Sequence, residues 1–544
     1  MMMVGKGGPE GRSSGDVAIV GHMKGEKVVS TDRMIRAAGL RHHWPDAPGT
    51  RHHGQPRRVG ARFGQAGVQQ RSLTGYEGAQ IVKVDLKIRL PGLLVMVLAV
   101  VTVSGCIGTV VPPPSVSPSP SATSPSAPEA SLRWAKTMGG NGFDVFNSVA
   151  LAPNGDIIAV GWTTSTDGDF PAKIYPQGGN AVVTRLSPDG TKLWARTYGG
   201  NNGSSFASVV VSADGSIFAV GQASPKGDFN CDFGGAAMGQ AAVKLDADGK
   251  IAWSRCFTAS SFGVYDFVSL SSVAVASDGI YLAGKTVVSL SPGPSGSMNA
   301  GLVVKLDLDG NLVWFRIYDA DAQDSFAAVT VDQQSDVIVA GATAPGNGPM
   351  DDQGNPDGLV VVYDSSGHQA WARTYGGSGL DGFTALTLGS DKKIVVAGFT
   401  TSEDGDFSTQ PDGTGIGGVI AGLAMDGSLD WSTICTDSQF TSIHSAADNH
   451  FVATGITWVS NGASPDPGSG SLPFDQSALV LKVTSSGVVE WSANLITTPV
   501  YFASVAVTAD GAATVVGTTS LTTGAMACPA DNSRSCAVVA TFYR

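Results

Sequence analysis

Aspartates in short clusters, two of them with a central glycine, are the residues of this sequence with the clearest capacity to bind a ligand. They occur at Asp167-Gly168-Asp169, Gly227-Asp228, Asp351-Asp352 and Asp404-Gly405-Asp406. Carboxylate and carbonyl oxygens at this spacing can coordinate Ca²⁺, and acidic pairs can also serve a glycosidase. However, none of the clusters matches a complete calcium loop, and Asp-Gly is equally what a solvated turn requires. Calcium is therefore left open without a ligand set, and no other cofactor or metal is predicted.

Histidine gives little support to a catalytic site. Residues 131–544 contain only His368, His444 and His450, and the repeat described below places all three in or beside short turns. The same range has no Gly-x-Ser-x-Gly, His-Glu-x-x-His or Cys-x-x-Cys motif. We therefore predict no catalytic residues and keep an enzyme only as the alternative to a binding protein.

Cys106 stands at the end of an apolar run with the features of an export signal. Lys87 and Arg89 precede this run, which is short for a membrane span, and it ends in Val103-Ser104-Gly105-Cys106. These last residues resemble the lipobox of bacterial lipoproteins. The resemblance implies that the sulfur of Cys106 is diacylated, with palmitate-type chains, and that Cys106 becomes the mature N-terminus. A lipid then holds the protein on the extracytoplasmic face of the cell membrane; a short membrane anchor with an incidental cysteine is the alternative.

The signal divides the chain into four parts. Residues 1–83 are expected to be a disordered extension or a mis-called start, with initiation near Val82 or Val84, and residues 84–105 the lipoprotein signal peptide. Residues 106–130 are the lipidated cysteine and a Pro/Ser-rich linker, whose composition predicts an extended spacer without a core. Residues 131–544 are the folded part.

The remaining cysteines fit an oxidising compartment. Cys528 and Cys536 flank one loop, and Cys231 and Cys256 fall on the same face of one repeat, so both pairs are disulfide candidates. Cys435 is left over. It is either a free buried thiol or a sign that this pairing is wrong.

Charge argues against nucleic acid as a partner. Residues 1–130 hold 15 of the chain's 34 Lys/Arg and 8 of its 46 Asp/Glu, which leaves 19 basic and 38 acidic residues from position 131 onward. A folded part that acidic is repelled by nucleic acid and by anionic lipid head groups.

A repeat of about sixty residues organises the folded part. Its clearest marker is a tryptophan spaced 57 to 61 residues apart, at Trp134, Trp194, Trp253, Trp314, Trp371, Trp431 and Trp491. From Trp194 onward each follows a short strand and a turn, and a second hairpin follows each tryptophan, as around Asp214-Gly215. Asp-Gly between two apolar runs is a hairpin signal, because glycine accepts the positive φ of the turn. Four strands in each period, lettered A to D outward, predict one blade of a β-propeller, with the tryptophan packed between blades.

The two ends of the folded part fix the number of blades. The first strand, residues 132–136, is a D strand with no A, B or C before it, and the last, residues 537–542, is a C strand with no D after it. Together they complete one blade and close the ring without a free edge. The sequence therefore predicts an all-β, seven-bladed β-propeller with closure by N- and C-terminal strands.

Two stretches, Trp371-Ala372-Arg373-Thr374-Tyr375-Gly376-Gly377 and Ile394 to Phe407, resemble the bacterial delta-sixty or SBBP-type propeller repeats. The resemblance covers residues 131–544 and weakens around Trp253 and Trp431. It implies the propeller fold and an extracytoplasmic setting, but no single activity.

The loops predict which face of the propeller binds. The A–B and C–D turns are short and share one face, whereas the B–C and D–A connections are long and share the other. Long loops on a rigid scaffold are where binding sites usually lie. We therefore expect a lipid-anchored, monomeric cell-surface module that binds a protein, glycan or cell-wall ligand through the long-loop face, with that face pointing away from the membrane. The alternatives are a quinoprotein-like or polysaccharide-active propeller enzyme and an envelope-assembly lipoprotein.

Overall fold

The computed structural model describes the ring and short parts of the preceding chain. It covers residues 70–72, 82–90, 93–99, 106–110, 130–171, 178–264, 267–289, 297–318, 322–345, 355–407, 415–460, 474–495, 500–529 and 534–544. The predicted cleavage region, residues 100–105, most of the expected extension and linker, and Asp351-Asp352 lie outside these ranges. β1 (Gln70–Ser72), β2 (Val82–Leu90) and β3 (Leu93–Ala99) form a small antiparallel sheet in a separate unit.

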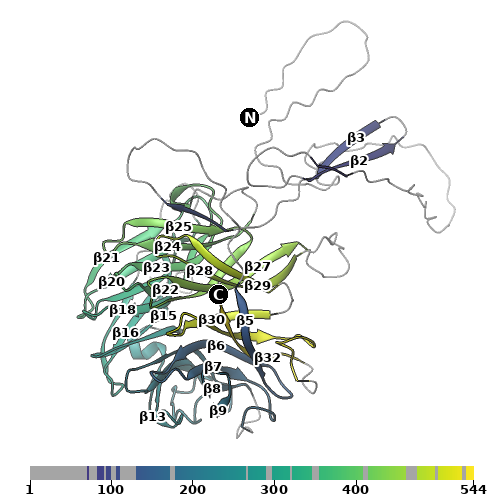
Figure 1. Cartoon of the computed structure of the whole chain (residues 1–544). Coiled ribbons are helices and arrows are strands. Elements are labelled where there is room, and N and C mark those ends of the chain that lie inside the picture. Colours follow the sequence, from purple (N-terminus) through teal and green to yellow (C-terminus); the bar gives the residue numbers. More distant parts are fainter. Residues whose placement is uncertain are drawn as a thin grey trace, which may run out of the picture. The chain divides into compact units, whose positions relative to one another are not determined.

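Seven four-stranded antiparallel blades make up the ring (Figure 1), which confirms the predicted fold class and blade number. Blades I to III are β6 (Asp144–Leu151), β7 (Ile157–Thr163), β8 (Asn180–Leu186) and β9 (Lys192–Tyr198); β10 (Ser205–Val211), β11 (Ile217–Ala223), β12 (Gly239–Leu245) and β13 (Ile251–Phe257); and β14 (Val268–Ala276), β15 (Gly279–Ser289), β16 (Ser297–Leu306) and β17 (Leu312–Tyr318). Blades IV and V are β18 (Ala322–Val331), β19 (Val337–Pro345), β20 (Asp357–Tyr363) and β21 (Gln369–Tyr375); and β22 (Asp381–Leu388), β23 (Ile394–Thr400), β24 (Gly417–Leu423) and β25 (Leu429–Cys435). Blade VI is β26 (Ser438–Ser445), β27 (Phe451–Ser460), β28 (Phe474–Val483) and β29 (Val489–Leu495), and blade VII is β30 (Val500–Val507), β31 (Ala513–Thr519), β32 (Cys536–Tyr543) and β5 (Ser131–Met138).

Helix is confined to two 3₁₀ turns in the described ranges. They are η1 (Ala259–Phe262), between blades II and III, and η2 (Gly405–Phe407), in the B–C loop of blade V. Within the same ranges, no helix has the length and apolar character needed to cross a membrane.

The chain closes its own ring as predicted. β5, which comes first in the folded part, pairs antiparallel with β32, which comes last, from Ala537 opposite Met138 to Tyr543 opposite Ser131. Blade VII is therefore built from both ends of the folded part (Figure 1). Because the outer strand of this blade comes from the N-terminal end, unfolding of either end exposes an unpaired edge.

The repeated tryptophans join neighbouring blades, as the repeat predicted. The indole N–H of Trp253 donates to the Leu308 carbonyl (3.1 Å), and that of Trp371 donates to the Met425 carbonyl (3.0 Å), in both cases a C–D turn of the next blade. Five of the seven are half-buried, and Trp431 and Trp491 are buried. The D strand is the outer strand of each blade, so a partly exposed indole there is expected.

A bulge in every A strand bonds each blade to the next around the axis. In five blades the residue after the bulge is serine, and its hydroxyl accepts the N–H of a residue in the A strand of the following blade. These pairs are Ser148–Val209, Ser208–Val273, Ser272–Val329, Ser442–Val505 and Ser504–Val149. Blades IV and V have Ala328 and Ala385 at this position, so their outgoing junctions lack this bond.

β4 (Cys106–Val110) adds a fifth strand to blade V. It pairs antiparallel with β25, with Cys106 opposite Cys435 and Val110 opposite Trp431. The sequence did not predict this strand, because residues 106–130 read as a linker.

Both predicted disulfides are present. Cys231 and Cys256 are bonded, and so are Cys528 and Cys536. Cys435 is disulfide-bonded as well, so it is not a free thiol. Its partner lies outside the residues whose side chains the structure describes.

Candidate functional site

The two Asp-Gly-Asp clusters hold loops to the main chain. Asp167 Oδ1 accepts the Asn141 N–H (2.8 Å), and Asp169 Oδ2 accepts the Gly139 N–H (3.1 Å). The glycine between them has φ +78°, and a Cβ there would lie 2.1 Å from the Gly139 carbonyl oxygen. Only glycine fits such a close approach in that conformation.

The same arrangement recurs in blade V. Asp404 Oδ1 accepts the Ser378 N–H (2.6 Å), and Asp406 Oδ2 accepts the Gly376 N–H (3.1 Å). The hydrogen bond from the Ser378 N–H holds the pKa of Asp404 below its usual value. Asp228 likewise accepts the Gly199 N–H (2.7 Å). In the described part of the chain, no three Asp, Glu, His or Cys side chains gather as a metal site would require. Of the two interpretations of these clusters, the geometry favours the turn.

A buried aspartate beside each of these two loops accepts further hydrogen bonds from the neighbouring residues. Asp144 is fully buried at the start of β6 and accepts the Gly140 N–H (3.1 Å), the Ser165 hydroxyl (2.7 Å) and the Thr163 hydroxyl. Asp381 in blade V accepts the Gly377 N–H (3.0 Å) and the Ser402 hydroxyl (2.6 Å). A buried carboxylate is tolerated when several donors surround it. These aspartates are therefore structural, although sequence inspection did not single them out.

The three histidines lie where the repeat placed them, away from the long loops. His368 is in the β20–β21 turn beside Asp364 (3.2 Å), and His444 is in β26. His450 follows the β26–β27 turn and contacts Glu490 (2.9 Å). Among the described residues, none of them hydrogen-bonds a Ser, Thr or Cys side chain.

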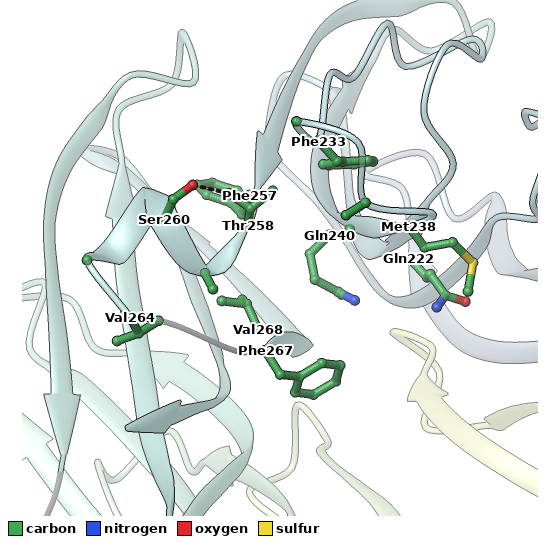
Figure 2. Close-up of a pocket in the computed structure, with 15 residues that line it drawn as sticks. Gln222, Phe233, Met238, Gln240, Phe257, Thr258, Ser260, Val264, Phe267 and Val268 are labelled. Atoms are coloured by element: carbon green, nitrogen blue, oxygen red, sulfur yellow. Dashed lines mark hydrogen bonds between the residues drawn. The ribbon is translucent and has the colours of Figure 1, made fainter. Parts of the chain in front are cut away.

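An apolar groove lies on the long-loop face between blades II and III (Figure 2). Its volume is about 850 Å³ and fifteen residues line it, none of them charged. The B–C loop of blade II forms one wall with Phe233 and Met238, and the D–A connection after β13 forms the other with Ser260, Val264 and Phe267.

The junction that holds the groove also departs from the repeat. In six blades a phenylalanine of the A strand lies opposite a glycine of the B strand. The aromatic ring of this phenylalanine packs on a Gly or Ala in the C strand of the preceding blade. A Cβ on Gly301, for example, would lie 2.5 Å from the Phe326 ring. Blade III has Leu270 instead of phenylalanine, and blade II has Gln240 instead of Gly or Ala. Gln240 Oε1 accepts the Leu270 N–H (3.2 Å). A smaller side chain and a polar one thus replace an aromatic contact.

Covalent and aromatic contacts hold both walls. The Cys231–Cys256 disulfide ties the B–C loop to β13, and Phe233 packs closely over Gly239, where a Cβ would lie 2.4 Å from its ring. On the other side, Phe262 of η1 stacks on Phe257 (5.6 Å between centroids) and contacts Phe315 edge-on (5.1 Å). The walls are therefore largely pre-formed, which lowers the entropy lost on binding.

The groove presents apolar surface to solvent, with side-chain amide groups beside it. Phe267 is 47% exposed and Met238 is 39% exposed, although both are large apolar side chains. The amides of Gln222 and Gln240 lie between the two walls (Figure 2). A side-chain amide donates and accepts hydrogen bonds, so the groove can receive an apolar side chain and bond the peptide groups beside it.

Comparisons with known proteins found similar solved structures but no matching family. No protein-family model matches the chain, and no curated protein matches it. The chain is similar to the WD40 domain of Pan2 from Neurospora crassa, at 10% identity and a TM-score of 0.40, over 73% of this chain and 88% of that one. It is also similar to a Dyadobacter fermentans protein of unknown function (13%, TM-score 0.37, 65% of this chain and 100% of that one) and to YCF48 bound to a D1 peptide (8%, TM-score 0.39, 77% and 98%).

A second cavity, of about 500 Å³, lies on the short-turn face between blades VI and VII, where charged side chains pair with one another. Lys482 contacts Asp448 (2.8 Å) and Glu490 (3.3 Å), and Arg544 contacts Glu490 (3.4 Å). Burial pushes the pKa of Glu490 upward, but Lys482 and His450 together outweigh it and the net pKa is lowered. The charges are mutually satisfied, so this cavity is the weaker candidate.

Proposed function

We propose that this protein is a lipid-anchored cell-surface binding module that captures a protein partner through the groove between blades II and III. The observation that supports this most is an uncharged groove with two exposed apolar side chains, at the one junction of the described blades that lacks the inter-blade phenylalanine contact. Two glutamine amides beside that apolar surface suit a peptide segment that inserts one apolar side chain. Membership of the delta-sixty or SBBP-type repeat group, and attachment through Cys106 on the extracytoplasmic face, are part of the same proposal.

Peptide selection tests the groove directly. The full chain is used to select from a displayed library of random ten-residue peptides, and the enriched peptides are expected to share an apolar residue. Phe267→Asp is expected to weaken their binding about 30-fold, because removal of a central apolar contact costs about 2 kcal/mol. Calorimetric titration of one enriched peptide measures the change.

Val488→Asp is the matched control, because Val488 is 52% exposed and lies in a C–D turn on the opposite face. It should bind the peptide as the unaltered chain does. Equal losses in both variants would contradict the groove as the site. A glycan-array signal that Phe267→Asp removes, without any enriched peptide, would replace the protein partner by a glycan.

Lipidation of Cys106 has a chemical consequence for Cys435. A sulfur atom in a thioether to diacylglycerol cannot also form a disulfide. If the disulfide partner of Cys435 is the sixth cysteine of the chain, the lipidated protein must carry Cys435 as a thiol. Membrane-extracted protein, unfolded without reductant and treated with iodoacetamide, is expected to gain one carbamidomethyl group at Cys435. Cys106→Ala should remove the lipid mass and release the protein from the membrane fraction; retention there would contradict the anchor.

A further inference from the structure

The outer strands of blades V and VI lack a basic residue that the outer strands of the other five blades have. Five D strands have a basic residue two positions after the tryptophan: Lys136, Arg196, Arg255, Arg316 and Arg373. Charged side chains on an edge strand discourage pairing with another strand. Blades V and VI have Thr433 and Ala493 at this position. These two edges therefore carry no such protection.

The tryptophan of blade V lies deeper than in five of the other blades. Trp431 is opposite Gly422 in β24, where a Cβ would lie 2.3 Å from the indole. The equivalent positions in blades I and II are Arg185 and Lys244. Because Gly422 has no side chain, the Trp431 indole packs closely against the sheet. The indole therefore does not block a strand that pairs with β25.

A strand lies along this edge. β4 pairs with β25 over five residues, from Cys106 opposite Cys435 to Val110 opposite Trp431. β25 is buried at every position from Trp431 to Cys435. The corresponding strand of blade I, β9, is buried only at its last residue, Tyr198. The missing basic residue, the buried Trp431 and the paired strand β4 are three separate features of blade V.

We propose that the outer edge of blade V is a strand-accepting edge for residues 106–110 of the same chain, and that this pairing fixes where the anchor joins the ring. Antiparallel addition of a strand satisfies the N–H and C=O groups of an edge. The proposal concerns the pairing itself and needs neither the lipid nor the groove.

The pairing changes the expected orientation of an anchored protein. Cys435 ends β25, and the D–A connection that follows it belongs to the long-loop face. Residue 106 is opposite Cys435, so it lies at the long-loop end of blade V. If Cys106 carries the lipid, which rests on the proposed function, the anchor leaves from the side of the groove. The expectation that the long-loop face points away from the membrane would then not hold.

Hydrogen exchange of the full chain tests the pairing, in a Cys106→Ala background in which residue 106 can carry neither a lipid nor a disulfide. Amides in residues 106–110 are expected to exchange at least tenfold more slowly than an unstructured peptide. Thr433→Arg, which restores the charge found in five other blades, should abolish that protection. Ala493→Arg in blade VI is the control and should leave it unchanged.

A second variant leaves the ring sequence intact. Gly108→Pro combined with Thr109→Pro removes two successive N–H groups, and one of any two successive N–H groups in a strand points to its partner. β25 should then exchange faster, while β21 in blade IV should not change. Unprotected amides in residues 106–110 of the starting protein would overturn the proposal, and they would leave peptide binding in the groove unaffected.

Discussion

Replacement of Gln240 by Ala together with Leu270 by Phe is expected to abolish peptide binding while the ring stays folded. The pair restores the small residue and aromatic ring found at the other six junctions, so the phenylalanine should pack on β12 and fill the groove. We expect the Kd to rise at least 100-fold. The thermal midpoint should stay the same or rise, because an aromatic side chain that fits a core site adds buried apolar area.

The single variants distinguish loss of binding through a filled groove from loss of binding through a destabilised protein. Leu270→Phe alone must share its space with Gln240, and such overpacking costs about 1 to 3 kcal/mol. It should therefore weaken binding and lower the thermal midpoint together. Calorimetry and thermal unfolding of the two singles and the double measure both effects. Full binding by a folded double variant would show that the ligand does not use this groove.

Loss of the Asp144 carboxylate is expected to produce the largest fall in stability from a single substitution. Asp144→Ala leaves the Gly140 N–H and the Thr163 and Ser165 hydroxyls without their acceptor in a fully buried position. Hydrogen bonds to a buried charge contribute about 1.5 to 3 kcal/mol each and are not additive. We expect a loss of about 3 kcal/mol or more, measured as the shift of the urea midpoint.

Asp167→Ala is the matched control for this prediction, because it removes an exposed carboxylate from the neighbouring loop. Asp167 accepts one main-chain N–H, that of Asn141. Its removal should cost no more than about 1 kcal/mol. Similar midpoints for the two variants would contradict a special role of the buried aspartate.

Local signals in the sequence were sufficient for the blades and for closure. A hairpin depends on its own turn residues, and the unpaired strands at residues 132–136 and 537–542 can be seen without any knowledge of packing. The disulfides were predictable for a similar reason, because Cys231 and Cys256 occupy positions in one repeat whose register is known.

The groove and the pairing of β4 with β25 depend on contacts between residues that are distant in the sequence. Gln240 and Leu270 look ordinary in their own blades, and they stand out only when each junction is compared with the other six. The missing basic residue at Thr433 is a signal of the same kind. The Asp-Gly-Asp clusters could not be resolved at all from sequence, because the distinction between a turn and a calcium loop depends on which way the carboxylates point.

The pairing of β4 with β25 also determines how a pulling force would pass through an anchored protein. A ligand bound in the groove and drawn away from the membrane would put tension between the groove and residue 106. Five paired residues would pass that tension from β4 into blade V. β5 follows β4 in the chain, so the closure pair of β5 and β32 would carry tension only after β4 had peeled away. β4 would thus detach first under load, and the pairing of β5 with β32 that closes the ring would stay intact.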